Sequence, residues 1–200
     1  SASPKLRSAA IDICRSDVVG SPRKFNYPGL GAASPTTLRY INVAADLEEH
    51  FGSLDRFRVV EIGVGYGGQC LVVCGLHNPQ DYALVDLQPV LALTRRFLNE
   101  TSPSAPVSFH GANEIPELHT DLLISNYAFS ELRREIQDIY MTRLVDNARR
   151  GYMTFNHITP KSFRSISVKE FADRVGGKIL PERPNSYPGN KIVVWGVKPR

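Results

Sequence analysis

Short apolar runs alternate with amphipathic stretches along most of this chain of 200 residues. A short run that is rich in β-branched residues is typical of a parallel strand buried on both faces. Apolar residues spaced by three and four are typical of a helix with one buried face. On this basis, strands are predicted at 58–62, 82–87, 106–110, 121–126, 151–157, 178–180 and 191–197.

Helices are predicted before the first strand and between several of the others. Ser34 is a suitable N-cap because its hydroxyl can accept a hydrogen bond from a free amide of the first turn, and Gly52 is a suitable stop. In the helix predicted at 134–147, the residues expected to face inward are Ile136, Ile139, Tyr140 and Leu144. The remaining helices are predicted up to about residue 17 and at 69–76, 90–98 and 167–175.

This alternation predicts a Rossmann-like α/β fold with a central, mostly parallel sheet of seven strands and helices on both faces. The loop between the last two strands is rich in Pro, Asn and Gly, which predicts a closing antiparallel hairpin. We expect a single domain in which residues 1–52 form a helical lid and residues 53–200 form the core. The segment 25–33 is predicted to be a loop, either a functional lid or a plain connector.

A cluster of glycines follows the first strand of the core. Gly63, Gly65 and Gly68 fit the pattern G-x-G-x-x-G of nicotinamide dehydrogenases. However, Glu61 stands two positions before the first glycine, and Gly67 and Gly68 are adjacent, which widens the turn. An acidic residue followed by G-x-G-x-G, here Gly63, Gly65 and Gly67, resembles the first motif of class I S-adenosylmethionine-dependent methyltransferases. The resemblance implies the class I methyltransferase fold and a glycine turn that binds S-adenosylmethionine.

Neighbouring positions supply further candidates for binding this cofactor. Asp86, followed by Leu87, closes the second strand at a distance that suits a carboxylate accepting the ribose hydroxyls, although it could instead cap the next helix. Asn113 follows the third strand, near the expected place of the adenine. Tyr66 could contact the methionyl end of the cofactor, and Glu61 would hold the amides of the glycine turn or the amino group of the cofactor.

The fourth strand ends in polar and aromatic residues that are expected to face the methyl donor. Ligands of open α/β sheets bind outside the carboxyl ends of the strands. Ser125, Asn126 and Tyr127 are therefore predicted to line the cofactor pocket.

Two residues beyond strand ends are candidate general bases, since a hydroxyl acceptor must lose a proton. They are Glu131, after the fourth strand, and His157, after the fifth, whose usual pKa suits proton transfer near neutrality. The alternatives are that Glu131 caps its helix or pairs with Arg133 or Arg134, and that His157 is a surface residue.

Several segments resemble the bacterial sugar O-methyltransferase family. They lie at 34–40, 60–70, 123–132, 137, 140, 150–152 and 193–196. The run L-I-S-N-Y-A-F-S-E-L at 123–132 is the most specific of them. The chain departs from the family at Ser21, where asparagine is expected before proline, and at His157, where the family has no fixed histidine. The resemblance covers the chain from about residue 17 and implies an O-methyltransferase that acts on a hydroxyl of a sugar or glycan.

Composition limits the partners that are expected. The net charge of +4 comes from scattered basic residues, so no nucleic-acid partner is predicted. No apolar run approaches the length of a membrane span. Three cysteines without a secretory context predict reduced thiols and a cytoplasmic location. Cys70 and Cys74 are expected to be small buried residues and not metal ligands, so the reaction is predicted to need no metal.

Two other functions remain open at this point. The chain could be a catalytically silent S-adenosylmethionine-binding module of a larger polypeptide, or a nicotinamide-dependent oxidoreductase that uses the same glycines. The predicted closing hairpin and the lack of room for a substrate domain weigh against the oxidoreductase. The oligomeric state and the identity of the modified hydroxyl are left open by the sequence.

Overall fold

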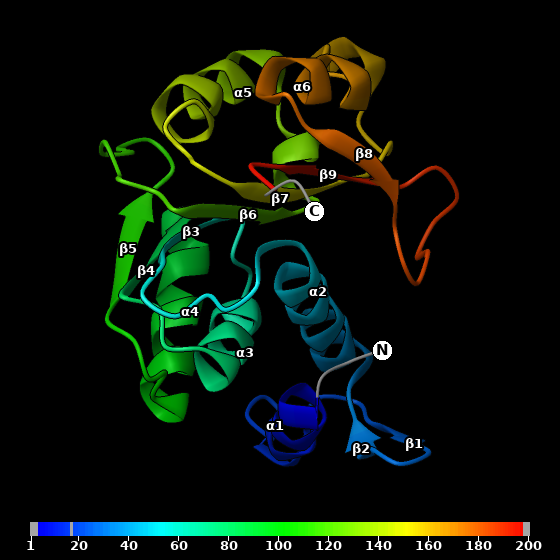
Figure 1. Cartoon of the computed structure of the whole chain (residues 1–200). Helices are drawn as coiled ribbons and strands as arrows, with labels where there is room; N and C mark the ends of the chain where they lie inside the picture. Colours follow the sequence, from blue (N-terminus) through cyan, green and yellow to red (C-terminus); the bar gives the residue numbers. More distant parts are fainter. Residues whose placement is uncertain (1–3, 17, 198–200) are drawn as a thin grey trace.

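The computed structural model describes residues 4–16 and 18–197 as a three-layer α/β structure (Figure 1). One face of the sheet is covered by α2, α3 and α4, and the other by α5 and α6. The helices are α1 (Pro4–Ser16), α2 (Pro35–Phe51), α3 (Gly68–Leu76), α4 (Gln88–Thr101), α5 (Arg134–Tyr140) and α6 (Val168–Val175), with short helical turns η1 (Ala128–Glu131), η2 (Met141–Val145) and η3 (Lys161–Phe163). The strands are β1 (Phe25–Tyr27), β2 (Gly31–Ala33), β3 (Arg58–Ile62), β4 (Asp81–Asp86), β5 (Val107–Gly111), β6 (Leu122–Asn126), β7 (Gly151–Phe155), β8 (Lys178–Pro181) and β9 (Lys191–Trp195).

The central sheet has the strand order β5-β4-β3-β6-β7-β9-β8. Neighbouring strands are parallel except where β9 pairs with β7 and with β8. This confirms the predicted seven-stranded, mostly parallel sheet with its antiparallel hairpin. The chain moves outward from β3 to β5 and then returns to β6 on the other side of β3. In such sheets, ligands bind at this reversal, outside the carboxyl ends of the strands.

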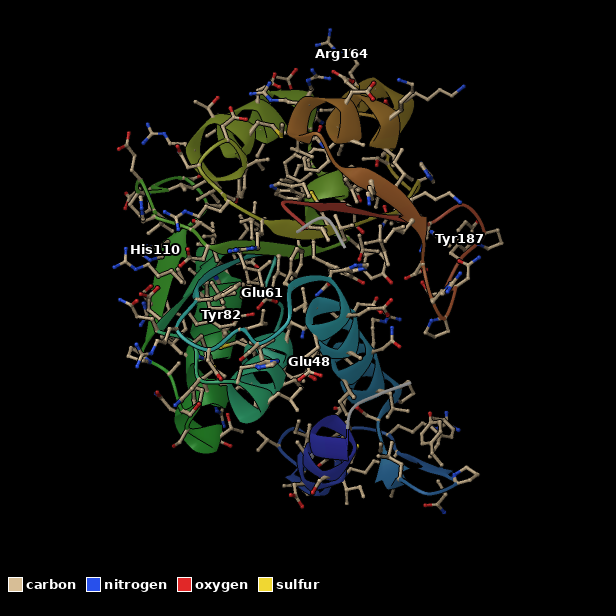
Figure 2. The ribbon with its side chains drawn as sticks, in the orientation of Figure 1. Glu48, Glu61, Tyr82, His110, Arg164 and Tyr187 are labelled. Atoms are coloured by element: carbon tan, nitrogen blue, oxygen red, sulfur yellow. The ribbon has the colours of Figure 1, made fainter. Side chains whose placement is uncertain are left out.

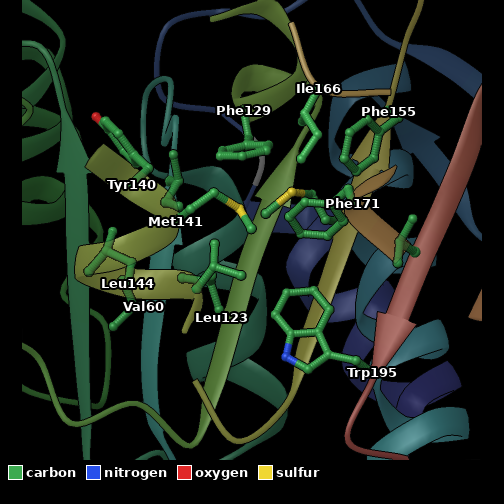
Figure 3. Packing of buried hydrophobic residues seen from close by; sticks show 14 of the residues in the cluster. Val60, Leu123, Phe129, Tyr140, Met141, Leu144, Phe155, Ile166, Phe171 and Trp195 are labelled. Atoms are coloured by element: carbon green, nitrogen blue, oxygen red, sulfur yellow. The ribbon is translucent and has the colours of Figure 1, made fainter. Parts of the chain in front are cut away.

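The sheet separates two hydrophobic cores, because successive residues of a strand point to opposite faces. In β6, Leu122 and Ile124 join the core on the side of α3 and α4, and Leu123 joins the core on the side of α5 and α6. The large rings of the second core, shown in Figure 3, belong to Phe129, Phe155, Phe171 and Trp195. Neighbouring rings among these four have centroids 5.1–6.2 Å apart.

The N-terminal elements pack against α3. Ala44 of α2 contacts the cluster that contains Leu76 of α3. Ser34 caps α2 as predicted, since its Oγ accepts a hydrogen bond of 3.1 Å from the amide of Thr37. The segment 25–33, predicted to be a loop, contains a short antiparallel hairpin formed by β1 and β2. The predicted end of the first helix, at residue 17, lies outside the described residues.

The helix predicted at 134–147 is present from Arg134 to Val145, but it is not one α-helix. α5 ends at Tyr140, and the π-helical turn η2 follows it. Tyr140 and Leu144 are buried as predicted, but Ile136 and Ile139 are 40% and 50% exposed. These two side chains differ from the prediction because they border a cavity at the end of the sheet and not the core. Across residues 4–16 and 18–197, none of the helices has the length and apolar character needed to cross a bilayer.

Candidate functional site at the carboxyl end of the sheet

A cavity of about 660 Å³ opens at the carboxyl ends of β3, β4 and β5. We call it the first cavity. Its walls come from the loops after these strands, from the turn after β6 and from α5. The residues that line it include Gly63, Asp86, Leu87, Asn113, Glu131 and Tyr140. All of these except Tyr140 are site residues predicted from the sequence.

The carboxylate of Asp86 is held in place by backbone amides. Its Oδ2 accepts a hydrogen bond from the amide of Val64, and its Oδ1 accepts one from the amide of Leu87, both at 2.7 Å. The residue at the N-cap of α4 is Leu87, so Asp86 does not cap that helix. Burial, together with the nearby charge of Asp86, raises the pKa of Tyr140 to about 12. Two carboxylate oxygens offer about four acceptor positions, so Asp86 retains capacity for a ligand in the cavity.

Of the three glycines predicted to bind the cofactor, Gly63 lines the first cavity. It has φ of +74°, and a Cβ added there would lie 1.9 Å from the Cβ of Ala128. The turns after β3 and β6 therefore touch at a place where no side chain fits. Gly65 and Gly67 lie against α4 instead. The carbonyl of Gly65 accepts a bond of 2.7 Å from Thr94, and a Cβ on Gly67 would lie 2.8 Å from the same side chain.

Glu61 lies beneath the glycine turn and is not among the residues that line the first cavity. Its side chain is buried, and its Oε2 accepts a hydrogen bond of 2.8 Å from the hydroxyl of Tyr82 (Figure 2). Burial raises the pKa of Glu61 to about 8; the bond from Tyr82 acts against this shift, and the charge of Asp86 adds to it. A charged carboxylate is costly to bury, so Glu61 is mostly protonated at neutral pH.

Tyr66 and Ser125 hold elements together. The ring of Tyr66 packs edge-on against Tyr40 and Phe97, with centroids 5.8 and 4.8 Å away. It thereby joins the glycine turn to α2 and α4, outside the first cavity. Ser125 is fully buried, and its Oγ donates a hydrogen bond of 3.1 Å to the carbonyl of Ile62. This bond ties the end of β6 to the end of β3.

A second cavity, of about 400 Å³, lies on the other side of the turn after β6. Its walls come from α2, from the ends of β6 and β7 and from the loop between β8 and β9. The residues that line this second cavity include Arg39, Asn126, Tyr127, Tyr152, Glu182 and Arg183. The predicted site residues Asn126 and Tyr127 therefore face the second cavity, whereas the next residue, Ala128, lines the first.

Tyr127 has φ of +70°, which is unusual for a residue with a large side chain. Its hydroxyl donates a hydrogen bond to Glu182 and contacts Ser186, and the guanidinium of Arg39 lies 5.5 Å from its ring centroid. Its amide donates a bond of 3.0 Å to the carbonyl of Thr154. Such a backbone conformation persists only where surrounding contacts hold it, and it is frequent at functional sites.

The two candidate bases lie in different places. Glu131 lines the first cavity, and its Oε1 accepts a hydrogen bond of 2.5 Å from the side-chain amide of Asn156. The suggested pairing with Arg134 is not found, because that guanidinium pairs with two other carboxylates. His157 is exposed in a separate hollow, and its Nε2 lies 3.0 Å from the carbonyl oxygen of Gly189. The geometry thus places Glu131, and not His157, beside the residues predicted to bind the cofactor.

Most residues of the second cavity were not found from the sequence. They come from segments without a recognisable motif, although the charged pair Glu182-Arg183 stands out in a loop of Pro, Asn and Gly. Tyr140 was assigned to the core because of its helical spacing, and its hydroxyl end was missed. Within residues 4–16 and 18–197, no group of three or more His, Cys, Asp or Glu side chains is arranged to hold a metal ion.

The strand order, the single antiparallel strand β9 and the cavity outside the strand ends define the class I methyltransferase fold. Among solved structures, the chain is similar to a magnesium protoporphyrin IX methyltransferase from Synechocystis PCC 6803 with bound S-adenosylmethionine. The TM-score is 0.61 at 14% identity, over 80% of this chain and 78% of that one. A Thermoplasma acidophilum protein gives a TM-score of 0.58 at 12% identity, over 94% and 96% of the two chains.

A third similar structure is an O-methyltransferase family protein from Burkholderia thailandensis. Its TM-score is 0.58 at 12% identity, over 80% of this chain and 55% of that one. No protein-family model matches the chain. A search of curated proteins finds no matching sequence. At these identities, the similarity shows the fold.

Proposed function

We propose that this protein is an S-adenosylmethionine-dependent O-methyltransferase that acts on a hydroxyl of a sugar or glycan. The observation that carries the proposal is the first cavity, which brings Gly63, Asp86 and Asn113 together from the ends of three strands of a class I methyltransferase fold. The sugar acceptor is supported by the resemblance of the run at 123–132 to the sugar O-methyltransferase family.

The residues of the first cavity fit the proposed cofactor. A volume of about 660 Å³ is within the range of ligand pockets, roughly 300–1,000 Å³. Asp86 would accept hydrogen bonds from the ribose hydroxyls with its remaining lone pairs. Leu87 follows it with a side chain that is 59% exposed, which offers an apolar surface to a flat base. Asn113 would bind the amino group of that base.

S-adenosylmethionine, when bound, supplies a methyl group on a sulfonium, which becomes a neutral thioether as the methyl passes to an acceptor oxygen. The chain must take the proton that this hydroxyl loses. We assign this role to Glu131, which lines the first cavity and is oriented by Asn156. His157 is the less supported base because it lies in a separate hollow. Residues 1–52 would act as the lid, since Arg39 of α2 lines the adjacent second cavity.

Calorimetric titration with S-adenosylhomocysteine tests the binding part of the proposal. We expect Asp86→Ala to weaken binding at least about 100-fold, because two charge-assisted hydrogen bonds contribute about 1.5–3 kcal/mol each. Asp81→Ala is the matched control, since Asp81 lies at the opposite end of the same strand. Equal affinity of the wild type, Asp86→Ala and Asp81→Ala for S-adenosylhomocysteine would contradict the proposal, and so would preferential binding of NAD.

Transfer of a labelled methyl group to a panel of glycans separates an active enzyme from a silent binding module. We expect Glu131→Gln to keep the affinity for S-adenosylhomocysteine and to slow transfer, whereas Glu135→Gln, an exposed control on the same segment, should change neither. Cofactor binding without transfer to any hydroxyl would favour the silent module.

A further inference from the structure

The second cavity shares a wall with the first. Consecutive residues of the turn after β6 face opposite ways, with Tyr127 in the second cavity and Ala128 in the first. A molecule in the second cavity would therefore be one turn of backbone away from a cofactor in the first. Under the proposed function, on which this inference rests, that is the place for the body of the methyl acceptor, whose reacting hydroxyl would have to reach past this turn to the methyl group and to Glu131 in the first cavity.

Two guanidinium groups and one carboxylate determine the charge of the second cavity. Arg39 and Arg183 are both exposed side chains that line it, and Glu182 is buried in its wall. Arg39 reaches it from α2, while Arg183 belongs to the loop between β8 and β9, the loop that carries the labelled Tyr187 in Figure 2. The two segments are joined where the side-chain amide of Asn42 donates a hydrogen bond of 2.5 Å to the backbone carbonyl of Arg183.

The carboxylate of Glu182 is already occupied by donors of the protein. It accepts hydrogen bonds from the hydroxyl of Tyr127, from the amide and hydroxyl of Ser186, and from the side-chain amide of Asn190 at 3.0 Å. Burial acts to raise its pKa, but these bonds outweigh burial and lower the pKa of Glu182 below its usual value. Glu182 is therefore a charged group that orders the wall and Tyr127, and its oxygens have little capacity left for a ligand.

The two arginines differ from Glu182 in this respect. Among residues 4–16 and 18–197, no carboxylate lies within ion-pair distance of Arg39 or of Arg183. Arg39 rests on the ring of Tyr127, which leaves the edge of its guanidinium group available. Guanidinium groups bind carboxylate and phosphate oxygens in a planar, often bidentate arrangement.

We propose that the second cavity binds the methyl acceptor and that this acceptor carries an anionic group, a carboxylate or a phosphate, which Arg39 and Arg183 hold. The rings of Tyr127 and Tyr152 line the same cavity and provide an apolar surface for the body of the acceptor. The side-chain oxygen of Asn126 is buried at this wall without a hydrogen-bond partner among the described residues, so it is free to accept a hydrogen bond from an acceptor hydroxyl.

Three methyl glycosides of matched shape test the proposal by ligand-observed NMR on the full chain saturated with S-adenosylhomocysteine. The neutral probe is methyl α-D-glucopyranoside, and the anionic probes are methyl α-D-glucuronide and methyl α-D-glucopyranoside 6-phosphate. We expect one anionic probe to bind at least tenfold more tightly than the neutral probe. Which of the two does so distinguishes a carboxylate from a phosphate.

Substitution of the arginines gives the residue-level test. We expect Arg39→Gln and Arg183→Gln each to weaken binding of the anionic probe about tenfold and to leave the neutral probe unchanged. Arg95→Gln is the matched control, because Arg95 also stacks on an aromatic ring, that of Phe109, but at the β5 edge of the sheet. Affinity for S-adenosylhomocysteine and the melting temperature are measured for every variant.

The outcomes separate this inference from the proposed function. If S-adenosylhomocysteine binds but no anionic probe is preferred, or if neither arginine variant weakens its binding, the anionic acceptor is wrong and the methyltransferase proposal stands. If the wild-type chain, well folded, does not bind S-adenosylhomocysteine, the proposed function fails and the acceptor assignment fails with it.

Discussion

The two cavities share one turn, but the chain builds them in different ways. Gly63, Asp86 and Asn113 of the first cavity each stand at the end of a strand or within two residues of it. The second cavity joins Arg39 on α2 to Glu182 after β8, two segments that are far apart in the sequence. Parallel strands bring their carboxyl ends to one edge, so chemistry at strand ends can be predicted from local patterns. The packing of a helix against a hairpin loop has no such local pattern.

The largest expected effect on stability comes from a substitution that disturbs the first cavity and not the second. Gly63→Ala should lower the free energy of unfolding by roughly 3–5 kcal/mol, because it combines a left-handed backbone with a clash against Ala128. Gly52→Ala is the control, since Gly52 has φ of +76° but open space around it, and should cost about 1–2 kcal/mol. Urea denaturation measures both. Equal losses would mean that the turns after β3 and β6 do not touch.

The next prediction compares how two buried carboxyl groups, those of Glu61 and Glu182, make the stability of the protein depend on pH. The pKa of Glu61 is raised to about 8 in the folded protein, against about 4.3 in an unfolded chain. The stability it contributes is therefore complete below about pH 4 and is lost as the pH rises to about 8. Between pH 5 and pH 8, the wild type should lose about 3 kcal/mol that Glu61→Gln does not lose. Denaturant midpoints across this range check the difference.

Glu182 should behave in the opposite sense, because its pKa is lowered in the folded protein. Its contribution is present above the unfolded pKa of about 4.3 and is lost as the pH falls below it. As the pH falls below about 4.3, the wild type should lose free energy of unfolding that the Glu182→Gln variant does not lose, whereas Glu61→Gln should have little effect on this loss. If the free energy of unfolding of the two variants depended on pH in the same way, the contrast between the two carboxyl groups would be wrong.

A smaller effect compares two buried tyrosines. Tyr82 donates to Glu61 at 2.8 Å, and Tyr152 donates to Asp46 at 2.7 Å. Tyr82→Phe should cost about 1–3 kcal/mol because its partner is fully buried and is left without a donor. Tyr152→Phe should cost less, since Asp46 is only partly buried and water can replace the lost donor. Thermal unfolding of both variants measures these costs. A cost of Tyr152→Phe equal to or larger than that of Tyr82→Phe would contradict the prediction.

The smallest effect concerns helix caps. Ser34 caps α2, whose first turn borders the second cavity through Pro35, whereas Ser167 caps α6, which borders neither cavity. Each change to alanine should lower stability by about 1 kcal/mol. Only Ser34→Ala should also weaken the binding of an anionic probe in the second cavity. Denaturation measures the stability of both variants, and ligand-observed NMR measures the binding of the probe. An equal effect of both variants on that binding would contradict the prediction.

Much of the fold followed from the sequence because strands and caps are local features. The sheet, its closing hairpin and the caps Ser34 and Gly52 were predicted, and they are present. Ile136 and Ile139 were assigned to the core because apolar spacing shows which side chains share a face but not whether that face meets a core or a cavity.

The candidate site was predicted less completely, for a related reason. The acidic residue before the glycine turn was expected to reach the cofactor, but the side chain of Glu61 points into the core and pairs with Tyr82. The residue at the same end of the next strand, Asp86, does line the first cavity. Glu61 lies opposite Leu84 in the sheet, two positions before Asp86, so its side chain stands inside the strand pair and not beyond the strand end. The pattern of apolar residues alone does not resolve this difference. Tyr66 was likewise placed by its neighbours in the sequence, whereas packing against Phe97 decides its position.

The adjacency of Tyr127 and Ala128 has a thermodynamic consequence. Because the two residues share one peptide unit, a ligand that displaced Ala128 would also shift Tyr127, whose hydroxyl donates a hydrogen bond to Glu182. Any such effect on affinity must be reciprocal: each ligand alters the dissociation constant of the other by the same factor. Through this single peptide unit, a ligand in either cavity would change the affinity of the other cavity for its own ligand.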